Sequence, residues 1–308
     1  MLPSWNPTPT RQAILDFLAA VTEPDSPDYA PLEARLAVFD NDGTLWVEKP
    51  YLVHFYALVA RYREMLRHQP LRLTRRAARA LLTNDTSDAD SIFQRSELAE
   101  LLGDMAGVPF SGMTDDEFAA WMRAWIEQWR HPRFGVSLAG LVYRPMVELI
   151  ALLHSLDFTV VIATADEAAF VRLFSAELFG VPPLRVLGSS FAPRPLAAGA
   201  ALDPLRLLRG HHPDFFHHGE DKPRCVEREM GRRPLLAAGN SDGDLPLLRW
   251  TAEGPALGET PRALPLVVRH TDAAREYAYD RGARRLRREA LIRRWTVVDM
   301  AVDWSQMF

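Results

Sequence analysis

The sequence predicts an α/β fold in which helices cover both faces of a parallel sheet, with one helical insertion. Short apolar runs bounded by turns alternate with helical stretches, a pattern typical of a parallel sheet. Two of these runs end abruptly in clusters of Asp, Asn and Gly. Between the first run and the rest, residues 48–135 contain helical patterns but no convincing strand. We therefore expect a doubly wound sheet that is interrupted once, early in the chain.

The core elements follow in order. Residues 11–21 place apolar side chains on one helical face, and residues 36–39 form the first buried strand. The other predicted strands are short apolar runs at residues 158–163, 184–187, 235–238, 266–268 and 295–298. Helical patterns cover residues 145–156 and 167–179. Residues 191–200, rich in Ala and Pro, are expected to form a loop.

The insertion is predicted to be all helical. Its expected helices lie at residues 50–67, 75–82, 91–105 and 115–129. Thr114 precedes the last helix and Glu117 follows three residues later, which is the pattern of a capping box. The chain would then divide into a first core part (1–47), a helical insertion (48–135) and a second core part (136–308).

One helix of the insertion carries a tryptophan stripe. Trp121, Trp125 and Trp129 recur every four residues, so they share one helical face. We expect this face to form the core of the insertion, with a wall of a substrate pocket as the second possibility.

Composition excludes several classes of protein. The chain has 308 residues, 48% hydrophobic and 25% charged, which excludes disordered and fibrous proteins. A net charge of −4 argues against a dedicated nucleic-acid binder, which would carry a basic excess. A single cysteine, Cys225, excludes a disulfide framework and a zinc site with several cysteines. Of the 36 basic residues only Lys49 and Lys222 are lysine, which is typical of a coding bias but marks both positions.

The N-terminal sequence predicts neither export nor membrane insertion. Residues 1–6 lack a basic segment, and no apolar segment of a signal peptide follows them. No apolar run approaches the ~20 residues that span a bilayer. We therefore expect a cytoplasmic protein without a membrane partner, unless a signal has been removed upstream.

Two aspartates follow the first predicted strand, in the motif Asp40-Asn41-Asp42-Gly43-Thr44. Two carboxylates on one turn can divide labour: one attacks as a nucleophile, and the other exchanges protons with the leaving group. The alternatives are a simple turn or a calcium loop. An EF-hand loop has glycine at its sixth position and lies between helices, whereas Gly43 is fourth and follows a strand. The motif therefore favours nucleophilic chemistry.

Two single residues are candidates for binding an anion. Thr164 ends the strand at 158–163, where its hydroxyl can meet an oxyanion; alternatively it caps a helix, with Glu167 completing a capping box. Lys222 is a compact positive charge suited to a phosphoryl group, although a surface lysine is the ordinary alternative.

A second polar cluster ends the strand at 235–238. Its sequence, Gly-Asn-Ser-Asp-Gly-Asp at residues 239–244, offers oxygen ligands of the kind that Mg²⁺ prefers. An Asx-rich turn is the alternative. In a parallel sheet the carboxyl ends of strands share one edge, so this cluster and the Asp40 motif are expected to meet there.

The order of these motifs resembles the haloacid dehalogenase superfamily of phosphohydrolases. An aspartate pair, a hydroxyl, a lysine and an acidic loop follow one another, and the resemblance covers the whole chain. It implies a Rossmann-like core, and the insertion after the first motif is similar to the helical cap of phosphoserine phosphatase-like members. Segments 39–46, 239–244 and 270–279 resemble a bacterial subfamily of poorly defined substrate.

The resemblance implies a role for each motif. Asp40 would attack phosphorus and form an aspartyl-phosphate. Asp42 would protonate the leaving oxygen and then deprotonate the water that hydrolyses the intermediate. Thr164 and Lys222 would hold the phosphoryl oxygens, and Lys222 would also restrain the Asp40 carboxylate.

The resemblance also implies a Mg²⁺ cofactor. It would be held by the Asp40 side chain, the Asp42 carbonyl and the residues Asn240 and Asp244, with Asp242 as the competing candidate. Many relatives have Gly-Asp where this chain has Gly-Asn at 239–240, so Asn240 would bind through its amide oxygen, without charge.

Two acidic residues are candidates for recognising the substrate. Asp166 and the glutamate after it add negative charge near an anion site, which hints at a substrate carrying an amine. A solvated helix N-terminus, which favours acids, is the alternative. Glu48 lies where the chain enters the insertion, either as a substrate contact or as a surface residue beside a hinge.

Two further patterns favour structural interpretations. The pairs His211-His212 and His217-His218 lie in a loop and only superficially resemble a transition-metal site. The Arg-rich stretch 281–294 is expected to be a solvated helix face and not a nucleic-acid patch.

Together, the sequence predicts a Mg²⁺-dependent phosphomonoesterase acting on a small soluble phosphorylated substrate, because a capped site disfavours proteins and nucleic acids. One alternative is a phosphotransferase that uses the same aspartyl-phosphate. Another is a non-catalytic protein that binds a phosphorylated ligand. The sequence does not reveal the substrate or the oligomeric state.

Overall fold

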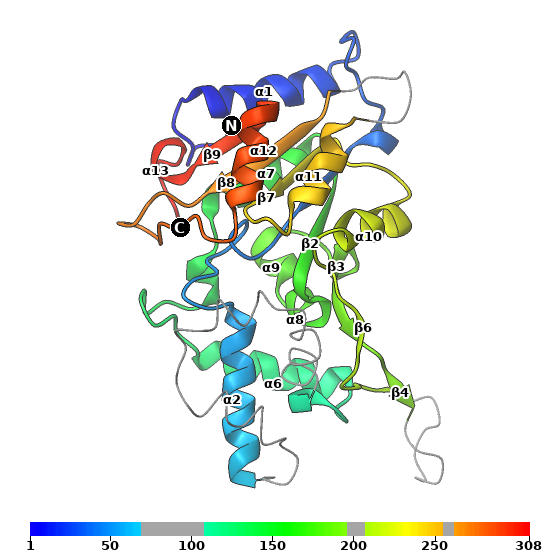
Figure 1. Ribbon diagram of the computed structural model, residues 1–308, viewed down its shortest axis with the longest axis vertical. Helices are drawn as coiled ribbons and strands as arrows, with labels where there is room; N and C mark the ends of the chain where they lie inside the picture. The colour runs from blue at the N-terminus through cyan, green and yellow to red at the C-terminus, as the bar shows by residue number, and fades with distance from the viewer. Residues whose placement is uncertain (69–107, 196–206, 255–261) are drawn as a thin grey trace.

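A seven-stranded sheet forms the centre of the molecule in the computed structural model, which describes residues 1–68, 108–195, 207–254 and 262–308 (Figure 1). The strand order is β6-β3-β2-β1-β7-β8-β9, and all neighbours are parallel except the edge strand β6. The strands are β1 (Leu36–Phe39), β2 (Thr159–Glu167), β3 (Val186–Phe191), β6 (Pro213–Phe215), β7 (Leu236–Gly239), β8 (Leu264–Arg269) and β9 (Thr296–Asp299). The predicted α/β class is thus confirmed, and a strand starts within two residues of each predicted one, whereas the antiparallel edge strand β6 was not predicted.

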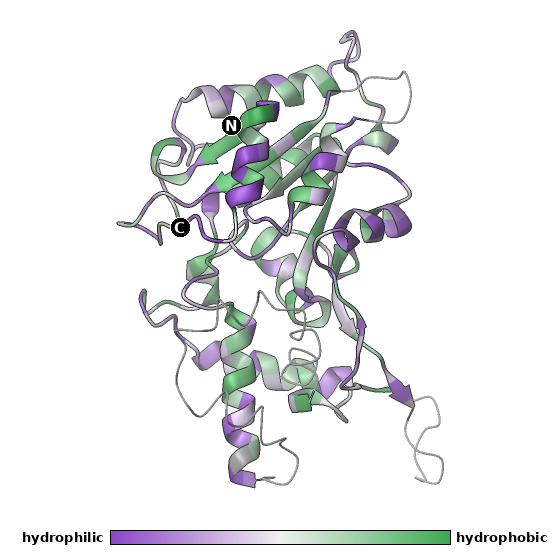
Figure 2. Cartoon of the chain, in the orientation of Figure 1, coloured by the Kyte–Doolittle hydropathy of each residue, from purple (hydrophilic) through white to green (hydrophobic). Residues whose placement is uncertain are grey.

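Helices cover both faces of the sheet because alternate strand residues point to opposite sides. In β1, Ala37 and Phe39 join one buried cluster, while Leu36 and Val38 join the other. The first cluster is covered by α1 (Pro9–Thr22), α7 (Arg144–Ser155), α8 (Ala168–Arg172), α9 (Ser175–Phe179) and α13 (Met300–Asp303). The second is covered by α10 (Asp221–Met230), α11 (Leu245–Ala252) and α12 (Arg284–Arg293). In Figure 2 the central strands are largely hydrophobic, whereas α12 is strongly hydrophilic, as expected for a solvated arginine-rich helix.

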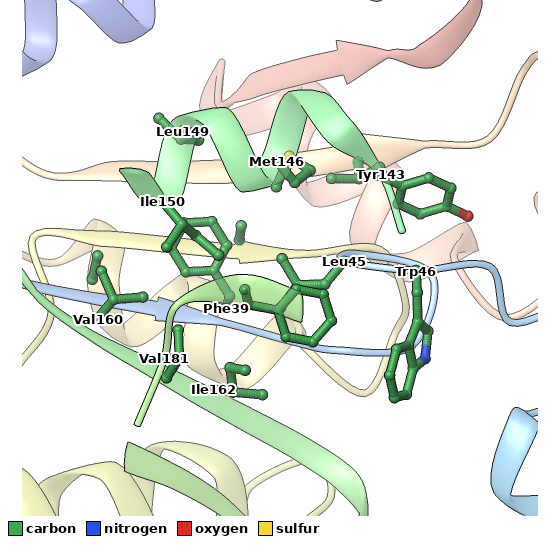
Figure 3. Close-up of a cluster of buried hydrophobic side chains, with 14 of the residues drawn as sticks. Phe39, Leu45, Trp46, Tyr143, Met146, Leu149, Ile150, Val160, Ile162 and Val181 are labelled. Atoms are coloured by element: carbon green, nitrogen blue, oxygen red, sulfur yellow. The ribbon is translucent and has the colours of Figure 1, made fainter. Parts of the chain in front are cut away.

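The core beneath α7 reaches the carboxyl end of β1 (Figure 3). Phe39, Ile150 and Ile162 pack between the helix and the sheet, and Trp46 lies at the end of the same cluster. All four side chains are fully buried, and burying one of this size stabilises a fold by about 1.5–3 kcal/mol. The loop after β1 is therefore anchored in the core by its own side chains.

One core prediction is wrong. Residues 167–179 were expected to form a single helix, but β2 continues through a register shift between Ala163 and Glu167, and two short helices follow. The Thr164 hydroxyl accepts a hydrogen bond from the Asp166 backbone N–H (3.0 Å), and Glu167 belongs to the strand, so the alternative capping box is also wrong. The irregularity lies in the last part of β2, where the Asp166 and Glu167 side chains are buried and Glu167 still pairs with Ser189 of β3.

The predicted insertion is represented by two described helices. These are α2 (Val53–His68) and α6 (Asp115–Gln128), which lie together below the sheet in Figure 1. The capping box of Thr114 and Glu117 is confirmed. The helices expected at 75–82 and 91–105 lie outside the described residues, and the division into 1–47, 48–135 and 136–308 stays a prediction.

The tryptophan stripe of α6 packs within this helical segment. Trp121 and Trp125 stack with ring centroids 6.3 Å apart, and Trp129 lies 5.5 Å from the ring of Tyr56 on α2. Trp121 Nε1 donates to Glu64 on α2 (2.8 Å). The stripe therefore joins the two helices, as expected for a packing role.

A hairpin arm links the core to the helical segment. The strands β4 (Arg194–Pro195) and β5 (Leu207–Leu208) pair in antiparallel fashion, so the loop expected at 191–200 is wrong for its described part. Arg209, directly after β5, donates its backbone N–H to the Met113 carbonyl (2.7 Å) and accepts from the Gly112 N–H (2.8 Å).

Among the described residues, no helix is long and apolar enough to cross a membrane.

Candidate active site

The predicted motifs meet at the carboxyl ends of adjacent strands. Asp40 follows β1, Asn240 follows β7 on one side, and Thr164 lies in β2 on the other side. Lys222 reaches the same place from the first turn of α10. The four motifs, separated by up to about two hundred residues of sequence, thus form one site, as the parallel topology requires.

Lys222 lies between two carboxylates. Its Nζ donates to Asp40 Oδ1 at 2.5 Å and to Asp244 Oδ1 at 2.6 Å. Lys222 is only 2% exposed, and both aspartates are buried as well. A buried ammonium requires such charged partners, because an unpaired charge in the interior is strongly unfavourable.

The three charges perturb one another. Burial, reinforced by the Asp244 charge, raises the pKa of Asp40 to about 7, although Lys222 acts in the opposite direction. Burial alone would raise the pKa of Asp244, but the bonds from Lys222 hold that pKa below its usual value. The same two carboxylates outweigh the burial of Lys222 and raise its pKa. The lysine is therefore charged over the whole physiological range.

Two oxygens of the site face a single hydroxyl. Thr44 Oγ1 lies 3.3 Å from Asp40 Oδ2 and 3.3 Å from Asn240 Oδ1. Since one hydroxyl carries one hydrogen, only one of these oxygens can accept from it at a time. The Asp40 and Asn240 oxygens therefore keep bonding capacity on the same side of the site.

Asp244 is engaged differently. Its Oδ2 accepts from the backbone N–H groups of Asn240 (3.1 Å) and Ser241 (2.9 Å), and from the Ser241 hydroxyl (3.0 Å). Its other oxygen accepts from Lys222. Asp244 thus closes its own loop and orients the lysine.

Asp42 has hydrogen-bond partners different from those of Asp40. Its Oδ1 accepts from Trp46 Nε1 at 2.8 Å, and its Oδ2 lies 3.4 Å from Asn41 Nδ2. Burial and then the nearby Asp166 charge raise the pKa of Asp42 well above the usual carboxyl value. A carboxyl group in this environment retains its proton and can donate it.

Thr164 is fixed by its surroundings. It is fully buried, and its carbonyl accepts from His217 Nδ1 at 3.0 Å. Burial and the Lys222 charge lower the pKa of His217 to about 3, so this imidazole is neutral. The sequence had drawn attention to His217 only as half of a histidine pair, and its role at the Thr164 strand end was missed.

A second polar cluster joins the core to the helical segment. His54 on α2 places Nδ1 2.5 Å from Asp166 Oδ1 and stacks on Phe170 with ring centroids 4.7 Å apart. Glu167 pairs with Arg209, whose Nη1 also lies 3.1 Å from Asp115 at the start of α6. We refer to His54, Asp166, Glu167 and Arg209 as the junction cluster. His54 and Arg209 carry no motif, so the sequence offered no signal for them.

Burial leaves the junction cluster incompletely bonded. Its four side chains are at most 9% exposed, yet each has a buried atom without a hydrogen-bond partner: His54 Nε2, Asp166 Oδ2, Glu167 Oε2 and Arg209 Nε. The Asp166 charge and hydrogen bond outweigh the desolvation of His54 and raise the pKa of its imidazole.

Glu48 is partly buried and is bonded on the Asn240 side of the site. Its Oε1 accepts from Asn240 Nδ2 at 3.0 Å and from the Tyr279 hydroxyl at 2.6 Å. Tyr279 stacks on His270, whose Nε2 lies 2.8 Å from the Gly43 carbonyl oxygen. His270 and Tyr279 belong to the segment 270–279 that resembles the bacterial subfamily, but the sequence analysis assigned no role to them.

The donors present fit a hard divalent cation. Asp40 Oδ2 and Asn240 Oδ1 are oxygens with remaining bonding capacity on one side of the site. Asp242 is turned elsewhere, because its Oδ1 accepts from the Leu286 N–H on α12 at 2.8 Å. Within the described ranges, no group of three or more His, Cys, Asp or Glu side chains is placed to hold a metal. A cation here would therefore depend on amide and carbonyl oxygens as well as carboxylates.

Comparison with known proteins agrees with this arrangement. The chain matches the haloacid dehalogenase-like hydrolases over residues 37–249, so it belongs to that family. No curated protein matches it. A solved protein of unknown function from Bordetella pertussis Tohama I is 17% identical with a TM-score of 0.53, over 86% of this chain and 98% of that chain.

Two further solved structures are similar. A functionally unknown protein from Anaerococcus prevotii DSM 20548 is 15% identical with a TM-score of 0.52, over 91% of this chain and 89% of that chain. A phosphoserine phosphatase from T. onnurineus is 17% identical with a TM-score of 0.37, over 78% of this chain and 86% of that chain. At these identities the Bordetella and Anaerococcus likenesses show the fold alone. The T. onnurineus structure, with its lower TM-score, is not used to infer fold or function.

Proposed function

We propose that the protein is a Mg²⁺-dependent phosphomonoesterase that acts through an aspartyl-phosphate on Asp40. The observation that carries this proposal is the placement of two carboxyl groups with different environments on one turn, Asp40 buried and Asp42 partly buried. Asp40 is paired with the Lys222 ammonium, which opposes the rise of the Asp40 pKa. Among the described residues, Asp42 accepts only from the neutral donors Trp46 and Asn41, and its pKa is raised well above the usual carboxyl value. Such separation of two carboxyl groups assigns a nucleophile and an acid.

In this mechanism the Asp40 carboxylate attacks phosphorus, and the bond to the leaving oxygen breaks as Asp42 delivers its proton to that oxygen. Asp42, now a carboxylate, then takes a proton from the water that attacks the acyl phosphate. The products are the free alcohol and inorganic phosphate, and both aspartates return to their starting states. Lys222 and Thr164 would neutralise and orient the phosphoryl oxygens.

Asp40, the Asp42 carbonyl and Asn240 would hold the Mg²⁺, with Asp244 supporting the site. When bound, the cation screens the nucleophile from the negative phosphate and stabilises charge that develops on the phosphoryl oxygens. Asp244 Oδ2 already accepts three hydrogen bonds from its own loop, and Oδ1 accepts from Lys222, so its contribution would be mainly to hold that lysine.

The helical segment at 48–135 would act as a cap that admits a small substrate and then excludes water. Its α2 carries His54 to Asp166, the strongest electrostatic neighbour of Asp42. Since Asp42 must face the leaving group, Asp166 would lie on the leaving-group side and contribute to substrate choice. The unpartnered Asp166 oxygen favours a leaving group with a hydrogen-bond donor, such as an amine or a hydroxyl.

A direct test uses hydrolysis of p-nitrophenyl phosphate with MgCl₂ or with EDTA. We expect Mg²⁺-dependent release of phosphate, and a loss of about 1,000-fold or more in Asp40→Asn, because a covalent nucleophile is removed. Asp25→Asn, at an exposed position before β1, is the matched control and should be unchanged. Equal activity of Asp40→Asn and wild type would overturn the proposal.

The substrate is best sought with a panel of phosphorylated metabolites. A second arm adds alcohol acceptors to the same reaction, because the acyl phosphate can be attacked by an alcohol as well as by water. New phosphorylated alcohols formed faster than inorganic phosphate would favour the phosphotransferase alternative.

A further inference from the structure

The Asn240 amide is bonded at both of its ends. Its Nδ2 donates to Glu48 Oε1 at 3.0 Å, and its Oδ1 lies on the other side, 3.3 Å from Thr44 Oγ1. An amide nitrogen can only donate, and a carboxylate oxygen can only accept. Glu48 therefore selects one of the two possible orientations of the Asn240 amide. In that orientation the amide oxygen faces the same hydroxyl as Asp40 Oδ2.

Glu48 is itself fixed by the C-terminal part of the chain. The Tyr279 hydroxyl donates to the same Glu48 oxygen at 2.6 Å. The Tyr279 ring stacks on His270 with centroids 4.2 Å apart, and His270 Nδ1 lies 3.1 Å from Glu276 Oε2. A run of contacts thus leads from the tail to the side chain that orients Asn240.

The packing around Gly43 shows how closely these groups approach. Gly43 has φ +74°, and a Cβ atom there would lie 2.0 Å from Asn240 Nδ2 and 2.9 Å from Glu48 Cδ. Only glycine leaves room for the Glu48–Asn240 contact against the backbone of the first motif. The contact is therefore part of the site and not an accident of two surface side chains.

We propose that Glu48 and Tyr279 are positioning residues that make Asn240 an effective neutral ligand for Mg²⁺. The inference rests on the proposed function. A hydrogen bond from the amide NH₂ to a carboxylate draws electron density toward Oδ1, and it prevents the amide from presenting its nitrogen to the cation. Glu48 thereby supplies the negative charge that a ligating carboxylate at position 240 would carry. It does so through its hydrogen bond to the Asn240 amide and not by contact with the cation. This role differs from both sequence-based interpretations of Glu48, a substrate contact and a surface residue beside a hinge.

The test is calorimetric titration of Mg²⁺ into the substrate-free protein, so that the readout does not depend on turnover. Glu48→Met removes the acceptor, and we expect affinity to fall about 10–100-fold, as for other outer partners of metal ligands. Glu48→Gln keeps an acceptor oxygen and should give an intermediate affinity. Tyr279→Phe, which removes one hydroxyl, should weaken binding by about threefold. Tyr277→Phe is the matched control, because Tyr277 packs on Arg133 instead, and it should bind like wild type.

A double substitution separates positioning from a merely structural role. In Asn240→Asp no amide remains to be oriented, and the new carboxylate would face Glu48. We therefore expect Glu48→Met to leave Mg²⁺ affinity unchanged or to improve it in that background, reversing the effect seen with Asn240. Circular dichroism and the unfolding midpoint of each variant check that it is folded.

The outcomes distinguish this inference from the proposed function. An equal loss of affinity from Glu48→Met in both backgrounds, or wild-type affinity in Glu48→Met and Tyr279→Phe, would overturn the positioning role while leaving phosphatase activity intact. Failure of the wild-type protein to bind Mg²⁺ would overturn both.

Discussion

Two groups of buried, charged side chains differ in how completely they are bonded: Lys222 with Asp40 and Asp244, and the junction cluster. Around Lys222, the ammonium contacts Asp40 and Asp244, and the loop around Asp244 uses its remaining oxygen. In the junction cluster, His54 and Asp166 pair with each other, yet both retain a buried polar atom without a partner.

The difference shows which part of the site is preorganised before substrate binds. A buried polar atom without a partner costs about 1–3 kcal/mol, so a protein retains several of them together only at a cost in stability. Lys222, Asp40 and Asp244 carry no such atom, as expected for a rigid catalytic centre, although Asn41 Oδ1 and His217 Nε2 nearby lack a partner. The junction cluster carries several such atoms, and it is also the place where the helical segment meets the core. We expect substitutions of Lys222 and its partners to lose activity. We expect substitutions in the junction cluster to change stability and substrate choice.

After the loss of the nucleophile in Asp40→Asn, the largest effect is expected at Lys222. An ammonium fits between two carboxylates, whereas the planar guanidinium of Lys222→Arg is larger and bonds in a fixed plane. We expect kcat/KM to fall about 100-fold or more, measured with p-nitrophenyl phosphate. Lys49→Arg is the control at the other lysine; Lys49 lies 4.9 Å from the Tyr279 ring, a contact that arginine also makes, so kcat/KM should be nearly unchanged. Similar losses in both variants would show that position 222 is not special.

These two lysines illustrate how far the sequence predicts the site. The strands and the Asp40, Thr164, Lys222 and 239–244 motifs were predictable, because short apolar runs and fixed strand-end chemistry are local signals. The rest depends on contacts across the chain. His54 approaches Asp166 only when α2 packs beside the extension of β2, and no local pattern encodes that register shift. The predictions for residues 69–107, 196–206 and 255–261 could not be compared, because these residues lie outside the described ranges.

A smaller effect is expected at His54, which tests the other region. His54→Gln removes the protonated partner of a buried carboxylate, so we expect about 3 kcal/mol of destabilisation in urea unfolding at pH 6. His212→Gln, at an exposed position, should change stability by less than about 0.5 kcal/mol. Equal stability of His54→Gln and wild type would show that the pair does not hold the helical segment to the core.

The His54 effect should also depend on pH. Its pKa is raised in the folded state, so the folded protein binds this proton more tightly than the unfolded chain does. The stabilisation is fully present below the unfolded pKa of about 6.5 and is lost as pH rises through the folded pKa. We therefore expect the stability difference between wild type and His54→Gln to shrink from pH 6 to pH 9. A difference that grows over this range would contradict the assignment of a proton to His54.

The smallest effect is expected at Asp242. Its carboxylate accepts from the first turn of α12, so Asp242→Ala should cost about 1 kcal/mol of stability, as for other lost helix caps. Mg²⁺ affinity should stay within about twofold of wild type, because Asn240 and not Asp242 faces Asp40. Loss of Mg²⁺ binding in Asp242→Ala, with stability unchanged, would reverse the assignment of these two residues.

The proposed mechanism requires a covalent phosphate on Asp40. In Asp42→Asn, the water that hydrolyses the intermediate loses its base, while p-nitrophenyl phosphate has a leaving group that departs without protonation. We therefore expect this variant, quenched in acid after reaction with Mg²⁺ and substrate, to carry phosphate on the peptide that contains Asp40. Hydroxylamine should release it, as it does from acyl phosphates. No phosphate on that peptide, from a variant that still binds Mg²⁺ and from a wild type that still turns over, would contradict the account.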